Sequence, residues 1–213
     1  LHPDDPPLSP LRGIGRILAD PTVTTVRLVT NPEKIVLKET QRAFMYFCLY
    51  GMTIDAVIIN RILPERIQDG FFDGWRNTQA RYIARVEKFF EPVPVWRLPL
   101  FDDEVLGVKA LERLATALYA DRDPAQVYYS EAPYQLKKVD GRYTLRMKLP
   151  FAESGDVQLY KRADELIVRV GSYKRHVLLP PRLAHREPEK AKLLAGNLVV
   201  TFRGGDAEEK KSA

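Results

Sequence analysis

The first part of the chain alternates apolar runs with segments of helical periodicity. Runs at 24–30, 55–60 and 93–98 are apolar or β-branched and predict buried strands. Apolar residues three and four apart predict helices at 32–50, 75–90 and 107–119. Asn31 and Pro32 are expected to begin the first helix, and Gly51 to end it. Strand–helix alternation of this kind predicts half of a doubly wound α/β domain.

Beyond about residue 120 the period of the pattern changes from helical to two. Apolar and charged residues alternate over 142–149, directly after Asp140-Gly141, a dipeptide typical of tight hairpins. Further short strands are expected at 157–160, 165–170, 174–179 and 197–202. This period-two pattern predicts a small all-β sandwich.

The change from strand–helix alternation to period-two alternation divides the chain into segments. We expect a Pro-rich connector at 1–20, the α/β part at 21–120, a linker at 121–132, the sandwich at 133–204 and a disordered charged tail at 205–213. The sequence begins Leu-His-Pro, without an initiator Met or a signal-peptide core, so a truncated or processed chain is expected.

Composition narrows the class of protein. The formal charge of +5 is scattered, and the densest basic stretch, 137–148, is interpreted as a solvated strand face, so nucleic acid is not expected as a partner. No apolar run approaches the ~20 residues of a membrane span. The single cysteine, Cys48, excludes an intrachain disulfide, lies on an apolar helix face and is predicted to be a core residue. A cytoplasmic location is therefore expected.

Three local patterns in the first part carry chemistry. The first is Thr-Val-Arg-Leu-Val-Thr-Asn-Pro-Glu-Lys at 25–34, which leads into Glu-Thr-Gln-Arg at 39–42. The second is the segment 55–64, in which Asn60-Arg61 closes the predicted strand. The third is the loop 97–107, which contains Pro99-Leu100-Phe101. In this order, over about a hundred residues, they resemble the arsenite-pump (ArsA-type) and tail-anchored-protein-targeting ATPases, a branch of the deviant P-loop NTPases. The resemblance implies the C-terminal half of a doubly wound P-loop NTPase domain.

The resemblance also implies an adenine-binding wall. An Asn that closes a parallel strand offers an amide donor and acceptor at the sheet edge where such domains bind ligands; taken alone, Asn60 serves equally well as a partner for loop backbone. Pro99, Leu100 and Phe101 would pack against the base, with Arg61 beside them. Glu33 and Glu39 are expected to be structural.

Two departures from the family pattern limit the expected chemistry. The chain contains no P-loop, and the stretch 72–79 holds no Cys-x-x-Cys zinc pair. ATP and Mg²⁺ are thus expected as ligands of the intact protein, none is expected to bind tightly to this part alone, and no catalytic or metal-binding residue is assigned. His176 and His185 are expected at the surface.

The sandwich resembles the α-crystallin-like domain of small heat-shock proteins, through the closing segment 191–202 and the Leu-Pro pairs at 149–150 and 179–180. The favoured function is the C-terminal part of an ArsA-type ATPase that energises anion transport or shuttles a client. Its implied partners are an N-terminal P-loop portion, a second copy in a homodimer, and a membrane transporter or client protein. Two alternatives stay open: a non-catalytic, chaperone-like or assembly module that works through the sandwich, and a sandwich that only stabilises the ATPase dimer.

Overall fold

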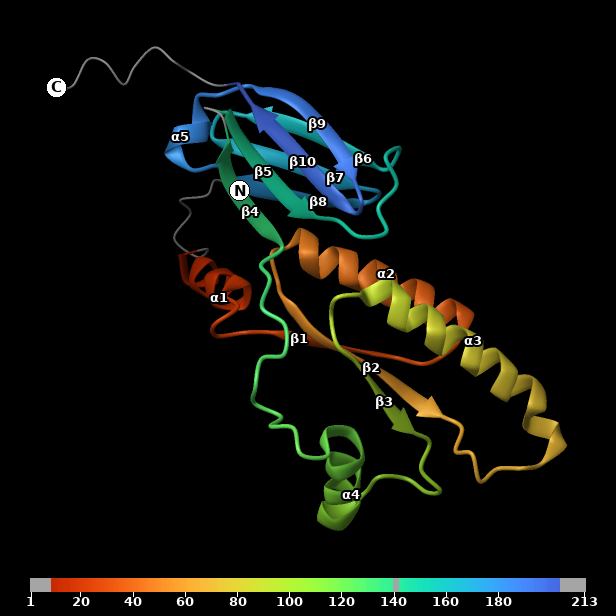
Figure 1. The fold of residues 1–213 in the computed structure, drawn as a ribbon. Coiled ribbons are helices and arrows are strands. Elements are labelled where there is room, and N and C mark those ends of the chain that lie inside the picture. Colours follow the sequence, from red (N-terminus) through yellow and green to blue (C-terminus); the bar gives the residue numbers. More distant parts are fainter. Residues whose placement is uncertain (1–8, 140–141, 204–213) are drawn as a thin grey trace. The chain divides into compact units, whose positions relative to one another are not determined.

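The fold was analysed in a computed structural model that describes residues 9–139 and 142–203 (Figure 1). The chain divides into two compact units. A parallel-sheet unit lies within Leu1–Phe44 and Thr53–Glu131, and a sandwich unit lies within Met45–Met52 and Ala132–Ala213. Because the last turns of helix α2 fall in the second range, that helix contributes side chains to both units.

The first unit is built on a three-stranded parallel sheet, as the sequence predicts. Its order is β1-β2-β3, with bounds Val26–Thr30, Ile54–Ile62 and Val95–Pro99. Helices α2 (Lys34–Leu49) and α3 (Asp73–Phe90) connect the strands, and α4 (Gly107–Tyr119) follows β3. Residues 9–19, in the segment expected to be a connector, form helix α1 (Ser9–Ala19), and Gly70–Phe72 form the 3-10 helix η2.

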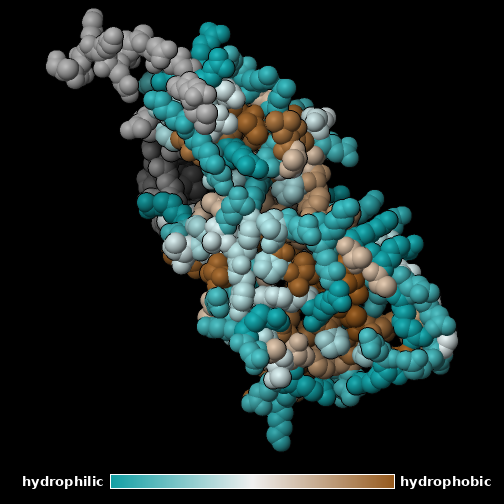
Figure 2. Space-filling view, viewed as in Figure 1, coloured by the Kyte–Doolittle hydropathy of each residue, from teal (hydrophilic) through white to brown (hydrophobic). Residues whose placement is uncertain are grey.

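The helices cover the two faces of this sheet unequally. Helices α2 and α3 run side by side in Figure 1. The ring centroids of Phe44 on α2 and Phe90 on α3 are 5.2 Å apart. On the opposite face, α4 packs Leu114 and Leu118 against a core that includes Trp96. The rest of the predicted apolar stripe of α4 is uncovered, since Val108 and Leu111 are exposed, and hydrophobic groups are visible on the surface of this unit in Figure 2.

Helix α2 differs from its prediction at one end. It begins at Lys34, two residues later than expected, and the Leu37 amide donates to the Glu33 carbonyl in the first turn. The Glu33 amide donates to the Asn31 carbonyl at 2.8 Å, so a tight turn occupies the positions that were expected to begin the helix. The other end is as predicted, since Gly51 takes a φ of 83°.

A buried ion pair closes the amino end of the parallel sheet. Asp55 of β2 is fully buried, and Arg27 of β1 donates to it from Nε at 3.1 Å and from Nη2 at 3.1 Å. Arg27 also donates to the carbonyls of Pro124 and Gln126, at 2.7 and 2.8 Å. The hydrogen bonds to Asp55 raise the pKa of Arg27 above its ordinary value. One guanidinium thus joins two strands to the segment that leaves α4.

Aromatic side chains enclose this guanidinium. The rings of Trp96, Tyr119 and Tyr128 have centroids 5.2, 5.9 and 5.7 Å from the central carbon of Arg27. Trp96 also makes edge contacts with Tyr119 and Tyr128, at 5.7 and 5.0 Å. Cation–π attraction and exclusion of water strengthen the bond between Arg27 and Asp55.

The second unit is a sandwich of two antiparallel sheets, as the sequence predicts. One sheet has the order β4-β5-β10-β9 and the other β6-β7-β8. The bounds are Tyr134–Val139 (β4), Arg142–Lys148 (β5), Val157–Arg162 (β6), Glu165–Val170 (β7), Tyr173–Leu178 (β8), Pro188–Leu194 (β9) and Asn197–Phe202 (β10), with the short helix α5 at Pro181–Ala184. The predicted turn at Asp140-Gly141 and the predicted tail lie outside the described residues, although β4 and β5 pair as the two arms of a hairpin would.

Inward side chains of both sheets form one core. Met147, Leu166, Val168 and Phe202 are buried in it, and Leu49 from the end of α2 joins them. Cys48, also in this unit, is 3% exposed and free, so the predicted core position is confirmed. Among the described helices none is long and apolar enough to cross a bilayer.

We predict that Asp55→Ala lowers the free energy of unfolding of the parallel-sheet unit by about 3–5 kcal/mol, because it leaves a partly buried cation without its partner. Urea unfolding followed by tryptophan fluorescence measures this unit specifically, since Trp75 and Trp96 both lie in it. Glu87→Ala is the matched control, because it breaks an exposed pair with Arg97 (2.9 Å) and should cost less than about 1 kcal/mol. Equal losses for the two variants would contradict the central role of Asp55.

The Cys48 thiol should be unreactive in the folded chain. Burial raises its pKa from 9.0 to about 12, so almost no thiolate forms at pH 8. Reaction with a disulfide reagent should be at least about a hundredfold slower in buffer than in urea. The sign of the shift also predicts a free energy of unfolding that falls as the pH rises from 9 towards 12, because the unfolded thiol ionises first. A native reaction as fast as that in urea would place Cys48 at the surface.

Candidate functional site

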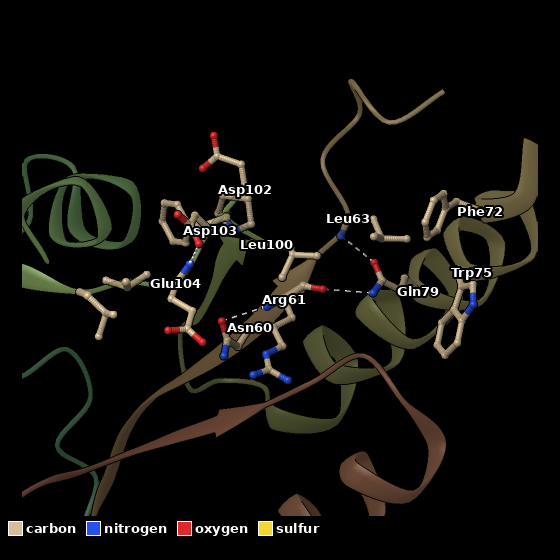
Figure 3. Close-up of a pocket in the computed structure, with 14 residues that line it drawn as sticks. Asn60, Arg61, Leu63, Phe72, Trp75, Gln79, Leu100, Asp102, Asp103 and Glu104 are labelled. Atoms are coloured by element: carbon tan, nitrogen blue, oxygen red, sulfur yellow. Dashed lines mark hydrogen bonds between the residues drawn. The ribbon is translucent and has the colours of Figure 1, made fainter. Parts of the chain in front are cut away.

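The carboxyl edge of the parallel sheet carries a cavity of about 760 Å³. All five predicted site residues line it: Asn60, Arg61, Pro99, Leu100 and Phe101. The remaining lining residues come from η2, from α3 and from the segments that follow β2 and β3: Leu63, Phe72, Trp75, Gln79, Asp102, Asp103, Glu104, Val105 and Leu106. Figure 3 shows this arrangement, with Asn60 and Leu100 at the ends of neighbouring strands. Residues about forty positions apart therefore meet because parallel strands end at the same edge.

Strand β2 ends in a bulge that sets the position of Asn60. The pairing with β3 is irregular between Ile59 and Ile62, and Arg61 adopts a φ of 58°, which is rare for a residue with a side chain. Asn60 Oδ1 accepts a hydrogen bond from the Arg61 amide at 2.9 Å. Within the described part of the chain the Asn60 Nδ2 group has no protein partner, so the side chain presents a donor to the cavity.

Gln79 holds this bulge from helix α3. Its Nε2 donates to the Arg61 carbonyl at 3.2 Å, and its Oε1 accepts from the Leu63 amide at 2.9 Å (Figure 3). The side chain is buried, so both bonds are shielded from water. Sequence reasoning missed Gln79, although a glutamine among the inward positions of an amphipathic helix is a signal that could have identified it.

The loop after β3 forms the second wall. Leu100 is 39% exposed, which leaves a flat apolar surface open to a ligand. Phe101 packs against the core beneath α4, and the guanidinium of Arg113 lies 5.1 Å from its ring centroid. The Leu100 amide donates to the Ile62 carbonyl at 2.8 Å, so this wall is fixed to the end of β2 by backbone pairing.

Three consecutive acidic residues border the cavity beyond this wall. Asp102 pairs with Arg113 at 3.1 Å, and Asp103 Oδ1 accepts from the Glu104 amide at 2.7 Å. Glu104 completes the set along the lining of the cavity. Their charges repel anionic groups of a ligand and tolerate uncharged ones, so the electrostatics of this edge favour a neutral ring over a phosphate.

Other residues singled out in the sequence lie away from the cavity. Thr40 donates to Thr30 at 2.8 Å, which fixes α2 to the end of β1, and Glu39 pairs with Arg42 at 2.9 Å on the helix surface. His176 is exposed, as is His185, but Nδ1 of His176 lies 2.8 Å from Glu165 across two strands, a neighbour that the sequence did not reveal. Among the described residues no group of three His, Cys, Asp or Glu side chains is arranged to hold a metal ion.

The fold and the cavity define a two-part α/β and all-β protein: a strand–helix parallel sheet with a cavity at its carboxyl edge, followed by an antiparallel sandwich. The sequence profile of the anion-transporting ATPase family matches residues 7–120, and that of the HSP20-like domain found in ArsA matches residues 140–202. The chain therefore belongs to the ArsA anion-transporting ATPase family and carries the HSP20-like domain at its C-terminal end.

Curated relatives agree with this assignment. "Putative arsenical pump-driving ATPase 1" of Aquifex aeolicus is 42% identical over 194 residues, which cover 89% of this chain and 49% of the relative. The "Putative arsenical pump-driving ATPase" of Chlorobaculum tepidum is 38% identical over 181 residues, covering 85% of this chain and 45% of the relative. A more distant one, "ATPase ASNA1 homolog" of Trypanosoma cruzi, is 28% identical over 113 residues, 52% of this chain and 32% of the relative. The chain thus spans about half the length of the first two relatives.

We predict that Gln79→Ala loosens the bulge of β2, because two shielded backbone groups lose their partners. The free energy of unfolding should fall by about 1–3 kcal/mol. Hydrogen exchange at the Leu63 amide should accelerate with it under native conditions. Asn77→Ala, an exposed position on the same helix, is the matched control and should change neither quantity. Unaltered protection of Leu63 in Gln79→Ala would show that the glutamine does not hold the bulge.

Proposed function

We propose that this chain supplies the adenine-binding side of an ATP site in a longer ArsA-type ATPase. The observation that carries the proposal is the cavity of about 760 Å³ in which the Asn60-Arg61 bulge faces the Pro99-Leu100-Phe101 wall. An apolar cleft of this size with few convergent polar groups is typical of small-molecule sites. An adenine ring would lie against Leu100 and Pro99, with Asn60 reading its edge.

The orientation of Asn60 suits the edge of an adenine ring. Because its oxygen already accepts from the Arg61 amide, the side chain offers a donor to the ligand. The unprotonated ring nitrogens of adenine accept such a bond. Guanine also presents acceptors, at N7 and O6, so this donor alone does not select between the two bases.

The acidic residues at 102–104 fix the direction of the nucleotide in this proposal. They favour the neutral base at this edge and repel the triphosphate, which would extend away towards a P-loop and Mg²⁺ elsewhere in the longer protein. This matches the absence of a P-loop from the sequence of the chain. The chemistry of hydrolysis would then belong to residues outside this half of the protein, and the chain alone should bind ATP weakly.

The activity proposed for the longer protein is suggested by the family to which the chain belongs. We propose that ATP hydrolysis in the longer protein drives the transport of an anion, as the names of the arsenical pump-driving relatives suggest, and that the protein works in the cytoplasm as a dimer with a membrane transporter or a client. The alternative of a chaperone-like binding module would place the working surface on the sandwich.

The test is the dissociation constant of ATP measured on the longer protein by calorimetry. Asn60→Ala combined with Phe101→Ala should raise it at least about tenfold, because the edge contact and the support of the wall are lost together. Phe71→Ala is the matched control, since Phe71 is an exposed phenylalanine that does not line the cavity. An unchanged constant in the double variant would overturn the proposed adenine site.

A further inference from the structure

Positive charge is concentrated in the sandwich. Residues 133–203 contain fifteen Lys and Arg against seven Asp and Glu, a formal charge of +8, whereas residues 1–132 contain sixteen against eighteen, a formal charge of −2. The formal charge of the whole chain is modest because a strongly basic sandwich segment and a slightly acidic first segment are summed in it. Such an asymmetry indicates an anionic partner for the basic part.

The strand register gathers much of this charge on one side of the four-stranded sheet. Tyr143, Leu145 and Met147 of β5 point into the core, so the residues that alternate with them point outward, and the pairing carries this alternation to β4, β10 and β9. The outward cations are Lys137, Arg142, Arg146, Lys148, Lys190 and Lys192, and we call this surface the basic sheet face. Glu189, at a bulge in β9, is the only acidic residue in these four strands.

The cations alternate with uncharged side chains in both directions across the strands. One row across the sheet reads Gln135, Arg146, Val199 and Lys192, and the next reads Lys137, Thr144, Thr201 and Lys190. Neighbouring strands lie about 4.8 Å apart, so the four strands span roughly 15 Å. β4, β5, β10 and β9 lie side by side in Figure 1. The result is a broad array of spaced positive charges, and these two rows contain no acidic residue.

The composition of this surface disfavours nucleic acid and hydrophobic partners. The aromatic residues of these strands, Tyr134, Tyr143 and Phe202, belong to the core side, so none is available to stack on a base. A sheet face also lacks the protruding helix or ribbon that enters a DNA groove. Protein hot spots need buried aromatic or apolar anchors, and among the described side chains of the outward rows the apolar residues are Val199 and Leu194.

We propose that the basic sheet face binds the surface of a bilayer that contains anionic lipids. Spaced lysines and arginines on a broad face match the diffuse negative charge of phosphatidylserine or phosphatidylglycerol headgroups better than they match any single ligand. Each basic residue near such a surface strengthens binding about fivefold, and salt weakens the attraction. The contact would be peripheral, because no described helix is able to span the bilayer.

The experiment is sedimentation of the full chain with vesicles of phosphatidylcholine alone and of phosphatidylcholine with about 30 mol % phosphatidylserine, at about 50 and 300 mM salt. The test variant carries Arg146→Gln, Lys190→Gln and Lys192→Gln. The matched control carries Arg162→Gln, Arg169→Gln and Lys174→Gln, three exposed cations on the outward side of the other sheet. Both variants lose three positive charges. A difference in their binding therefore reports the location of the charges and not the net charge of the chain.

Wild-type chain should bind the anionic vesicles and not the neutral ones, and the higher salt should release it. The test variant should partition at least about tenfold more weakly, and the control less than about threefold. Thermal melting checks that each variant is folded; should the triple variant unfold, Lys192→Gln alone should weaken binding about fivefold. Equal binding to both vesicle types, equal losses in the two triple variants, or tighter binding to a DNA or RNA oligonucleotide at the same salt would each overturn the proposal.

Discussion

The bond between Arg27 and Asp55 is the constraint on which the parallel-sheet unit depends. A carboxylate with no exposure to water needs a charged partner, and the guanidinium of Arg27 on the adjacent strand supplies it. Because Arg27 also binds the carbonyls of Pro124 and Gln126, the same interaction brings the chain back across the sheet after α4. Arg27 thus contacts the neighbouring strand, the ring of Trp96 and the segment by which the chain leaves this unit.

The opposite edge of the same sheet is built on a different principle. There the backbone departs from regular pairing, Arg61 takes a left-handed conformation, and Gln79 satisfies the groups that the bulge releases. Strain of this kind persists only where the surroundings hold it, and it is common at ligand sites. The stabilising ion pair thus lies at the amino end of the sheet, and the irregular backbone that lines the cavity lies at the carboxyl end.

The sequence predicted the elements well because their signals are local. Continuous apolar runs gave the three parallel strands, and alternation over 142–149 gave the antiparallel texture. The five residues of the candidate site were predicted from the family resemblance, and they line one cavity because parallel strands end at the same edge of a sheet. Their role in binding stays a prediction. Gln79 and the partners of Arg27 were not found, since they depend on which side chains meet across helices and loops far apart in the chain. The start of α2 was placed two residues too early, because the Glu33 amide bonds to the Asn31 carbonyl in a tight turn that the capping pattern did not reveal.

Among the described strands, β1 pairs with β2 alone, and Val29 on it is exposed. An unpaired strand edge is a template on which another chain can add a strand. In relatives about twice as long, further polypeptide is available to fill that position. When residues 1–213 are produced alone, two copies can instead join through their β1 edges. A dimer of this kind would be an association of open sheets, and its size in solution would say nothing about the subunit arrangement of the longer protein.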